Sequence, residues 1–164
     1  MAFVLYPHAA LATPAPPAPV DAALLAVGQR LLAAAETAAA YGLAAAHIGE
    51  PAPVIVLNLT ADHPPASYLL LFNPSIVAVA TETAPGKEAS VSLPGAEVEI
   101  DRPVWAEIGY QDETGAARTM RLEGFVARCA LHEIEQMNGR FFLANLSRLK
   151  RDMALKKSQK RRQG

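Results

Sequence analysis

A helix near the C-terminus is the segment that most constrains how this chain can fold. It is predicted from Phe125 to Met137 and is ended by Asn138-Gly139, since glycine readily adopts the backbone conformation that follows a helix. The helix carries His132, Glu133 and Gln136 in the order His-Glu-Ile-Glu-Gln. A complete His-Glu-x-x-His motif places two imidazoles one turn apart on one face, where both can bind one zinc ion, with the glutamate as general base. The last ligand of that motif is replaced here by glutamine.

Strand-like runs separated by turns occupy most of the chain before this helix. Asp21 can cap an earlier helix that runs to about Ala40, and the four prolines within residues 11–20 predict an extended arm ahead of it. Asn73-Pro74 predicts a turn or kink, and Gln111–Gly115 predicts a hairpin turn. Strands are predicted at residues 54–59, 68–72, 76–79, 97–100, 104–110 and about 119–122. Short, mostly antiparallel strands around one central helix predict an α+β fold.

Composition favours one compact domain, which we place at residues 1–146. The chain of 164 residues is 51% hydrophobic and 19% charged. No apolar run reaches the roughly 18–20 residues of a membrane-spanning helix, so no membrane partner is expected. The N-terminal segment lacks the basic region and cleavage site of a secretory signal. The single cysteine, Cys129, excludes an internal disulfide and is expected to be a buried apolar thiol, so we predict a cytoplasmic protein.

The C-terminal segment, residues 147–164, is strongly positively charged. It holds eight Lys or Arg residues and one acid, Asp152, which gives +7 in a chain whose net charge is −1. We predict a basic helix or a frayed coil from about Ser147. Positive charge gathered in this way is typical of a surface that meets a polyanion, and RNA is the expected one in the cytoplasm. A solvated chain end without a partner is the alternative.

Three segments, in this order, resemble the motifs of the peptide deformylase family, and the resemblance covers nearly the whole chain. Gly42-Leu-Ala-Ala-Ala-His47 is similar to a Gly-Leu-Ala-Ala-x-Gln box, and Glu88-Ala-Ser-Val-Ser92 to a Glu-Gly-Cys-Leu-Ser box. The segment His132–Gly139 is similar to a box that begins His-Glu-x-Asp-His. The resemblance implies the α+β deformylase fold. It also implies the family reaction, in which the formyl group is hydrolysed from the N-terminal formyl-methionine of new polypeptides by a hydroxide bound to Fe²⁺ or Zn²⁺.

The same resemblance places the metal ligands at Ser90, His132 and Gln136, where the family has a cysteine and two histidines. A thiolate is a charged, soft donor, whereas a serine hydroxyl is neutral and an amide oxygen is a poor donor for these metals. Two of the three ligands are therefore replaced. We expect the site to hold no metal or to bind a divalent metal weakly. Glu133 matches the residue that moves the proton.

Further departures from the family pattern fall in the same motifs. The glutamine that helps to bind the formyl oxyanion is matched by His47, the glycine of the second motif by Ala89, and a nearby arginine by Glu97. The implied substrate-binding positions are Gly42, Leu43, Val91, Arg128 and Cys129. The clustered changes favour an inactive or strongly impaired relative that binds a nascent peptide N-terminus or the ribosome. The basic tail, residues 148–164, would contact rRNA, as the C-terminal helix of bacterial deformylases does.

Several interpretations of the polar residues stay open. His132 can be a hydrogen-bonded structural histidine and not a ligand. An active alternative is a hydrolase or amidase with an altered metal site, in which His47 joins His132 and Glu133, with Gln136 or Ser90 as a further donor. A Ser90–His132 nucleophile–base pair is a further alternative, although no orienting partner is visible for it.

Overall fold

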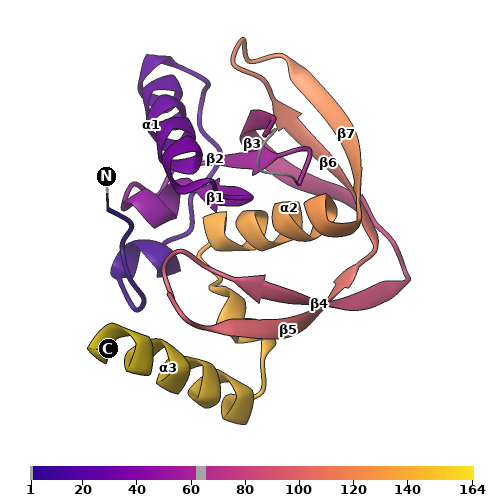
Figure 1. The fold of residues 1–164 in the computed structure, drawn as a ribbon. Coiled ribbons are helices and arrows are strands. Elements are labelled where there is room, and N and C mark those ends of the chain that lie inside the picture. The colour runs from indigo at the N-terminus through magenta and orange to yellow at the C-terminus, as the bar shows by residue number, and fades with distance from the viewer. Residues whose placement is uncertain (1, 62–65) are drawn as a thin grey trace.

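The computed structural model describes residues 2–61 and 66–164. Its elements are η1 (Ala9–Ala12), α1 (Ala22–Ala38), β1 (Gly42–Ala44), η2 (Ala45–Ile48), β2 (Val54–Asn58), β3 (Tyr68–Val79), β4 (Thr83–Ala89), β5 (Glu97–Pro103), β6 (Trp105–Gln111), β7 (Ala117–Glu123), α2 (Gly124–Met137), η3 (Phe142–Asn145) and α3 (Arg148–Gln163). The arrangement is an α+β fold with antiparallel sheets, as the sequence predicts (Figure 1). None of the described helices is long and apolar enough to cross a membrane.

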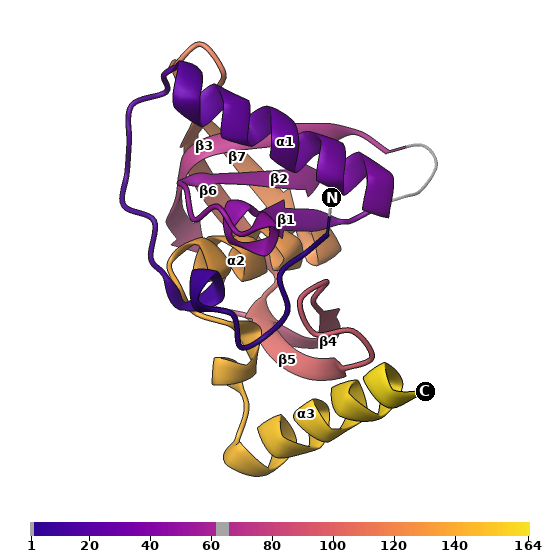
Figure 2. The ribbon, with the colours of Figure 1, turned by 90° about the vertical axis from the view of Figure 1, so that its left-hand side faces the viewer.

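A five-stranded sheet of order β1-β2-β3-β6-β7 forms the middle of the molecule. Helices α1 and α2 pack on its opposite faces (Figure 2). The strands alternate their side chains between the two faces, so that Ile55 and Leu57 of β2 pack toward α2, whereas Val54 and Val56 pack toward α1. The helix α1 comes close to the sheet at Gly28, where a Cβ atom would lie 2.9 Å from Cζ of Phe72.

The α2 helix is buried on nearly all sides because a second layer covers its other face. That layer is the two-stranded sheet of β4 and β5, and α3 lies beyond it (Figure 1). The inner face of α3 packs through Ala154 and Leu155 against a cluster that includes Leu93 and Ile100. The polar residues of α2 are thereby enclosed between two sheets, and this arrangement positions the site described below.

Most of the predicted elements are confirmed. Asp21 caps α1 by accepting a hydrogen bond from Leu24 N–H at 2.9 Å, and the basic segment forms a helix capped by Ser147. The kink predicted at Asn73-Pro74 is also present, because Asn73 has a left-handed backbone (φ 47°) and β3 changes register there. The Asn73 side chain holds the bend by accepting from Ala18 N–H at 2.9 Å and donating to Ala18 O at 2.7 Å.

Two predictions about local structure are wrong, and two strands were missed. Residues 68–72 and 76–79 belong to one strand, β3, since the bulge bends the strand without ending it. The arm predicted at residues 11–20 is extended only in part, because η1 includes residues 11 and 12. The strands β1 and β4 were not predicted. The first is only three residues long, and the second contains Pro85 and Gly86, which are tolerated because β4 pairs on one side only, with β5.

Candidate functional site

A cavity of about 430 Å³ lies between β1 and η2, β4, and the middle of α2. Its size falls within the range of small-ligand sites. The substrate-binding positions that the sequence suggests all line it: Gly42, Leu43, Val91, Arg128 and Cys129. Of the candidate catalytic and metal residues, His47, Ser90, His132 and Glu133 also line the cavity. Tyr41 and Phe125, which pack edge to face with ring centroids 4.9 Å apart, line it as well, and no sequence pattern points to this pair.

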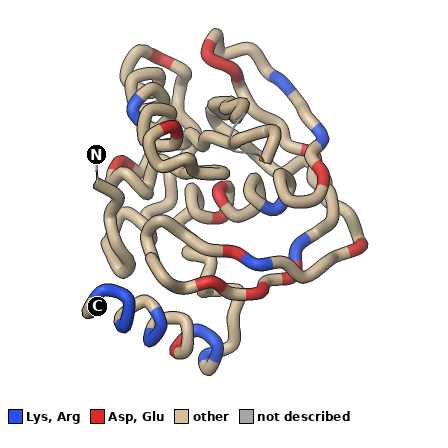
Figure 3. Tube along the Cα trace, viewed as in Figure 1, with Lys and Arg blue, Asp and Glu red and all other residues tan. Residues whose placement is uncertain are grey.

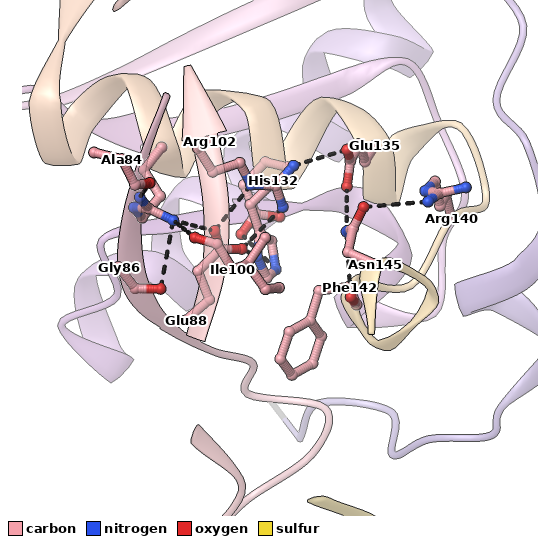
Figure 4. A network of polar contacts seen from close by, with 12 residues as sticks. Ala84, Gly86, Glu88, Ile100, Arg102, His132, Glu135, Arg140, Phe142 and Asn145 are labelled. Atoms are coloured by element: carbon pink, nitrogen blue, oxygen red, sulfur yellow. Dashed lines mark hydrogen bonds and ion pairs between the residues drawn. The ribbon is translucent and has the colours of Figure 1, made fainter. Parts of the chain in front are cut away.

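Glu88 on β4 is the centre of the polar network beside this cavity (Figure 4). Its carboxylate accepts two hydrogen bonds from Arg102, each at 2.9 Å, one from Arg128 at 2.9 Å, and one from His132 Nδ1 at 2.8 Å. Burial alone would raise the pKa of Glu88, but the hydrogen bonds and charges of Arg102 and His132 outweigh it and hold the pKa at about 2. Glu88 is therefore a fixed negative charge whose oxygens are fully used by the protein.

Arg128 joins α2 to both strands of the second layer. Its guanidinium donates to Ile100 O at 2.6 Å and to Ala84 O at 2.8 Å, in addition to Glu88. It lies directly against Gly86, where a Cβ atom would be 2.5 Å from Cζ of Arg128. Arg128 thus forms part of the cavity wall while its charge is directed at Glu88.

His132 takes part in this network through its ring nitrogen Nδ1, and the residue also lines the cavity. Because the Glu88 carboxylate can only accept, Nδ1 of His132 carries the proton of their hydrogen bond. Burial opposes a charged ring, but the hydrogen bond that His132 donates to Glu88 and the charge of Glu133 raise the pKa of His132. Its Nε2 lies 4.0 Å from Glu133 Oε1.

His47 is fixed by the turn that follows β1. The backbone N–H of Ala44 donates to His47 Nδ1 at 3.0 Å, which assigns the proton of the neutral ring to Nε2. The imidazole is only 1% exposed, and burial lowers its pKa, so it stays neutral. Its Nε2 lies 3.5 Å from Ser90 Oγ, which also accepts from Ser92 N–H at 3.1 Å.

Gln136 is turned away from the cavity, although it shares α2 with His132. Its Nε2 donates to Leu11 O at 2.8 Å, and its Oε1 has no hydrogen-bond partner in the described chain. It is not among the described residues that line the cavity. The structure therefore brings His47, Ser90, His132 and Glu133 together and leaves Gln136 outside.

The donors that remain do not make a metal site of ordinary composition. No group of three or more His, Cys, Asp or Glu residues in ranges 2–61 and 66–164 could hold a metal ion. His132 Nε2 and Glu133 are two donors, whereas catalytic zinc sites use three protein ligands. His47 presents an N–H to the cavity, and a protonated nitrogen cannot bind a metal.

Cys129 also lines the cavity, but as an unreactive group. Burial, and then the charges of Glu133 and Glu88, raise the pKa of its thiol to about 12. The thiolate needed for metal binding or nucleophilic attack is thus disfavoured. Cys129 is half-buried, so the buried apolar thiol expected from the sequence is met only in part.

The arginine and glutamate that complete the network, Arg102 and Glu135, were missed in the sequence. Arg102 Nη1 donates to Glu135 Oε1 at 2.7 Å, and Asn145 donates to Glu135 Oε2 at 3.1 Å (Figure 4). The sequence does contain one signal that Arg102 points inward. Arg102 lies two positions after the buried Ile100 on β5, so its side chain is on the same, inner face.

Comparison with known proteins identifies relatives along nearly the whole chain. The family model for polypeptide deformylase matches residues 1–152. A peptide deformylase-like protein of Agrobacterium fabrum is 42% identical over 158 residues, which cover 96% of this chain and 94% of that protein. A peptide deformylase of the same organism is 33% identical over 138 residues, covering 84% of this chain and 81% of that protein. The crystal structure of peptide deformylase from Ehrlichia chaffeensis superposes with a TM-score of 0.89 at 28% identity, covering 99% of this chain and 97% of that one.

Proposed function

Because this chain belongs to the polypeptide deformylase family of metal-dependent hydrolases, we propose that it keeps the family's peptide cleft but lacks the metal-dependent hydrolysis. The family reaction removes the formyl group from the N-terminal methionine of new polypeptides. This chain would act in the same setting as a binding protein for peptide N-termini. Ser90 and Gln136, which replace two of the family's metal ligands, support the proposal.

The side chain of Gln136 is the observation that carries the proposal. Its amide donates to the backbone of Leu11, 125 residues away in the sequence, and so it pins the N-terminal segment to α2. A ligand at this position would have to face His132 across the cavity, but Gln136 does not line that space. Gln136 therefore stabilises the packing of the N-terminal segment and does not serve as a metal ligand. Such a structural role is expected at a former ligand position that no longer has to bind metal.

The remaining polar groups can bind and orient a peptide end without a metal. His47 Nε2–H is a donor for a carbonyl oxygen, and Ser90 Oγ is an acceptor as well as a donor. Leu43 and Val91 supply apolar walls, and the aromatic pair of Tyr41 and Phe125 adds contact area. The Glu88 network holds β4 and α2 in fixed relation, so the cleft is preformed.

The alternative is a hydrolase or amidase with an altered metal site at His47 and His132. It would require His47 to turn the lone pair of Nε2 toward a metal, with the ring proton on Nδ1. That tautomer would break the hydrogen bond from Ala44 N–H and place two N–H groups against each other. The donor geometry therefore favours the binding protein over the altered metalloenzyme.

The relatives in one organism fit this proposal. Agrobacterium fabrum has both a peptide deformylase-like protein and a peptide deformylase that are similar to this chain. Where one copy supplies the hydrolytic activity, a second copy is free to lose it and to keep the fold for binding. The higher identity to the deformylase-like protein, 42% against 33%, agrees with such a division.

The basic helix α3 supplies a second part of the proposal, contact with rRNA at the ribosome in the cytoplasm. Figure 3 shows Lys and Arg residues along α3. The exposed members Lys156, Lys157 and Lys160 leave the helix free to meet a polyanion, since its apolar side packs on the molecule through Ala154. This location would place the cleft near newly made peptide ends.

The proposal is tested by the family reaction itself. Protein is incubated anaerobically with excess Fe²⁺, Ni²⁺ or Zn²⁺, and release of formate from a formyl-methionyl tripeptide is measured beside an active deformylase. We expect no release above that of the Glu133→Gln variant. Formate release that depends on both added metal and Glu133 would overturn the proposal in favour of the altered hydrolase.

A further inference from the structure

The connection between β4 and β5, residues 90–96, has the cavity on one side and α3 on the other. Ser90 and Val91, at its start, line the cavity. Its second half packs in the apolar cluster that includes Ala154 of α3, and the C-terminal part of that helix lies beside the connection in both views (Figures 1 and 2). One short segment therefore forms part of the cavity wall and also touches the basic helix.

Gly95 brings this connection into direct contact with Arg161 of α3. A Cβ atom on Gly95 would lie 2.7 Å from Cδ of Arg161 and 2.9 Å from its Cβ, and the three nearest atoms all belong to that side chain. The aliphatic part of Arg161 therefore lies against the backbone of the connection, in a place that is free because position 95 has no side chain.

The guanidinium at the end of the same side chain is not used by the protein. Arg161 is exposed, and its charged group makes no hydrogen bond or ion pair within the described chain. A guanidinium can bind a phosphate through two parallel N–H groups. Arg161 thus joins an aliphatic stem that covers the connection to a charged group that is available to a polyanion.

The contact between α3 and the connection is not tightly fixed. The buried residues of α3 are Ala154 and Ser158. The hydroxyl of Ser158, and that of Ser92 in the connection, are buried and have no hydrogen-bond partner in the described chain. Each hydroxyl has lost water without a replacement, which disfavours the present arrangement. Both elements can therefore respond when a ligand binds to α3.

We propose that Arg161 is a positioning residue through which a polyanion bound to α3 orders the connection between β4 and β5. A phosphate on the guanidinium would hold the side chain in one conformation and keep its stem on Gly95. The connection would then lose conformational freedom, because the group that covers its backbone no longer moves. The inference rests on the proposed contact with rRNA and adds a consequence of that contact for the cavity.

Backbone hydrogen bonds carry the ordering from Gly95 to the cavity wall. Ala96 N–H donates to Leu93 O at 3.4 Å, and Leu93 N–H donates to Ser90 O at 3.0 Å. Ser92 N–H also donates to Ser90 Oγ, at 3.1 Å. An ordered connection therefore fixes Ser90, so RNA on α3 would prepare the cavity wall for a ligand. By linkage, a ligand held by Ser90 would in turn strengthen the binding of RNA.

The test measures hydrogen exchange of the connection in the full chain, with and without a saturating amount of a short polyuridine RNA. Exchange of the Leu93 and Ala96 amides is expected to slow by about threefold or more when RNA is bound. Arg161→Met keeps an aliphatic stem and removes the guanidinium. Its exchange without RNA should equal that of the wild type, and RNA should leave it unchanged. Arg162→Met, at the exposed neighbouring position, removes the same charge and should retain the RNA effect.

The outcomes separate this inference from the proposed rRNA contact. Fluorescence anisotropy of the labelled RNA measures binding in the same samples, so each variant is compared at saturation. Unchanged or faster exchange in the RNA-bound wild type, or an equal effect of RNA on Arg161→Met, would overturn the inference and leave the rRNA contact standing. Absence of RNA binding by the wild-type chain at low salt would overturn the rRNA contact and the inference with it.

Discussion

The guanidinium of Arg128 lies where a side chain at position 86 would have to be, since a Cβ on Gly86 would stand 2.5 Å from its Cζ. The two residues come from α2 and β4, which are neighbours in space and 42 positions apart in the chain. The glycine lets the guanidinium reach Ala84 O, Ile100 O and Glu88 at once. Arg128 and Gly86 therefore act as one unit that ties the second layer to the central helix.

Substitution of Gly86 by Val should destabilise the protein through this contact. The added side chain would push Arg128 away from Glu88 and leave buried hydrogen-bond partners unpaired. We expect a loss of about 2–4 kcal/mol in the free energy of unfolding, measured by urea denaturation. Thr83→Val, an exposed change on the same strand, is the control and should change that free energy by less than about 0.5 kcal/mol. Equal effects of the two changes would contradict the account of the Gly86–Arg128 contact.

The pH dependence of stability should report on Glu88. Its pKa is about 2 in the folded chain against an ordinary value of 4.5. A lowered pKa stabilises the folded state at pH values above 4.5, and the contribution is lost as the pH falls from 4.5 toward 2. Glu88→Gln should therefore be less stable than wild type by about 2–4 kcal/mol at pH 6, and the gap should narrow between pH 4.5 and 3. A gap that stays constant over that range would show that the Glu88 charge is not what stabilises this layer.

Restoring the two replaced ligands should create a metal site. The double variant Ser90→Cys with Gln136→His supplies two metal donors in addition to His132. The substitution at position 136 also removes the amide that donates to Leu11 O, so the new side chain can turn toward the cavity. We expect about one equivalent of Zn²⁺ in the double variant and much less in either single variant, measured by elemental analysis after dialysis. No gain in the double variant would show that the backbone around these positions has moved out of ligand geometry.

The charge of α3 should govern binding to ribosomes. The triple variant of Lys156, Lys157 and Lys160 to Gln removes three exposed positive charges and leaves the packed side of the helix, at Ala154, intact. Co-sedimentation with ribosomes should weaken, and the slope of log affinity against log salt should fall by about 2–3. A variant that sediments as the wild type does at low salt would remove rRNA contact from the proposal.

The sequence predicted the elements whose pattern is local. The helix 125–137 follows from the stop signal at Asn138-Gly139, and the hairpin between β6 and β7 follows from its turn residues. The strand β4 was missed because Pro85 and Gly86 look like a break, and only the pairing with β5 shows that both are tolerated at an edge.

The site was predicted where a motif names its residues, and missed where side chains meet across the fold. His47, Ser90, His132 and Glu133 were found from three motifs and do line one cavity. The contact of Gln136 with Leu11 joins positions 125 residues apart, and Arg102 reaches Glu88 from a neighbouring strand. Such contacts depend on how the layers of the fold pack against one another, and they produce no periodic pattern in the sequence.

The metal content of the wild-type chain tests the central claim most directly. The protein is purified without chelators and without a metal-binding tag, dialysed against a tenfold excess of Fe²⁺, Ni²⁺ or Zn²⁺ under argon, passed over a desalting column, and assayed by elemental analysis. With His47 protonated on Nε2 and Gln136 committed to Leu11, we predict less than about a tenth of an equivalent of any metal. Close to one equivalent, lost in His47→Gln or His132→Gln, would show that the cavity holds a metal centre and would contradict the account.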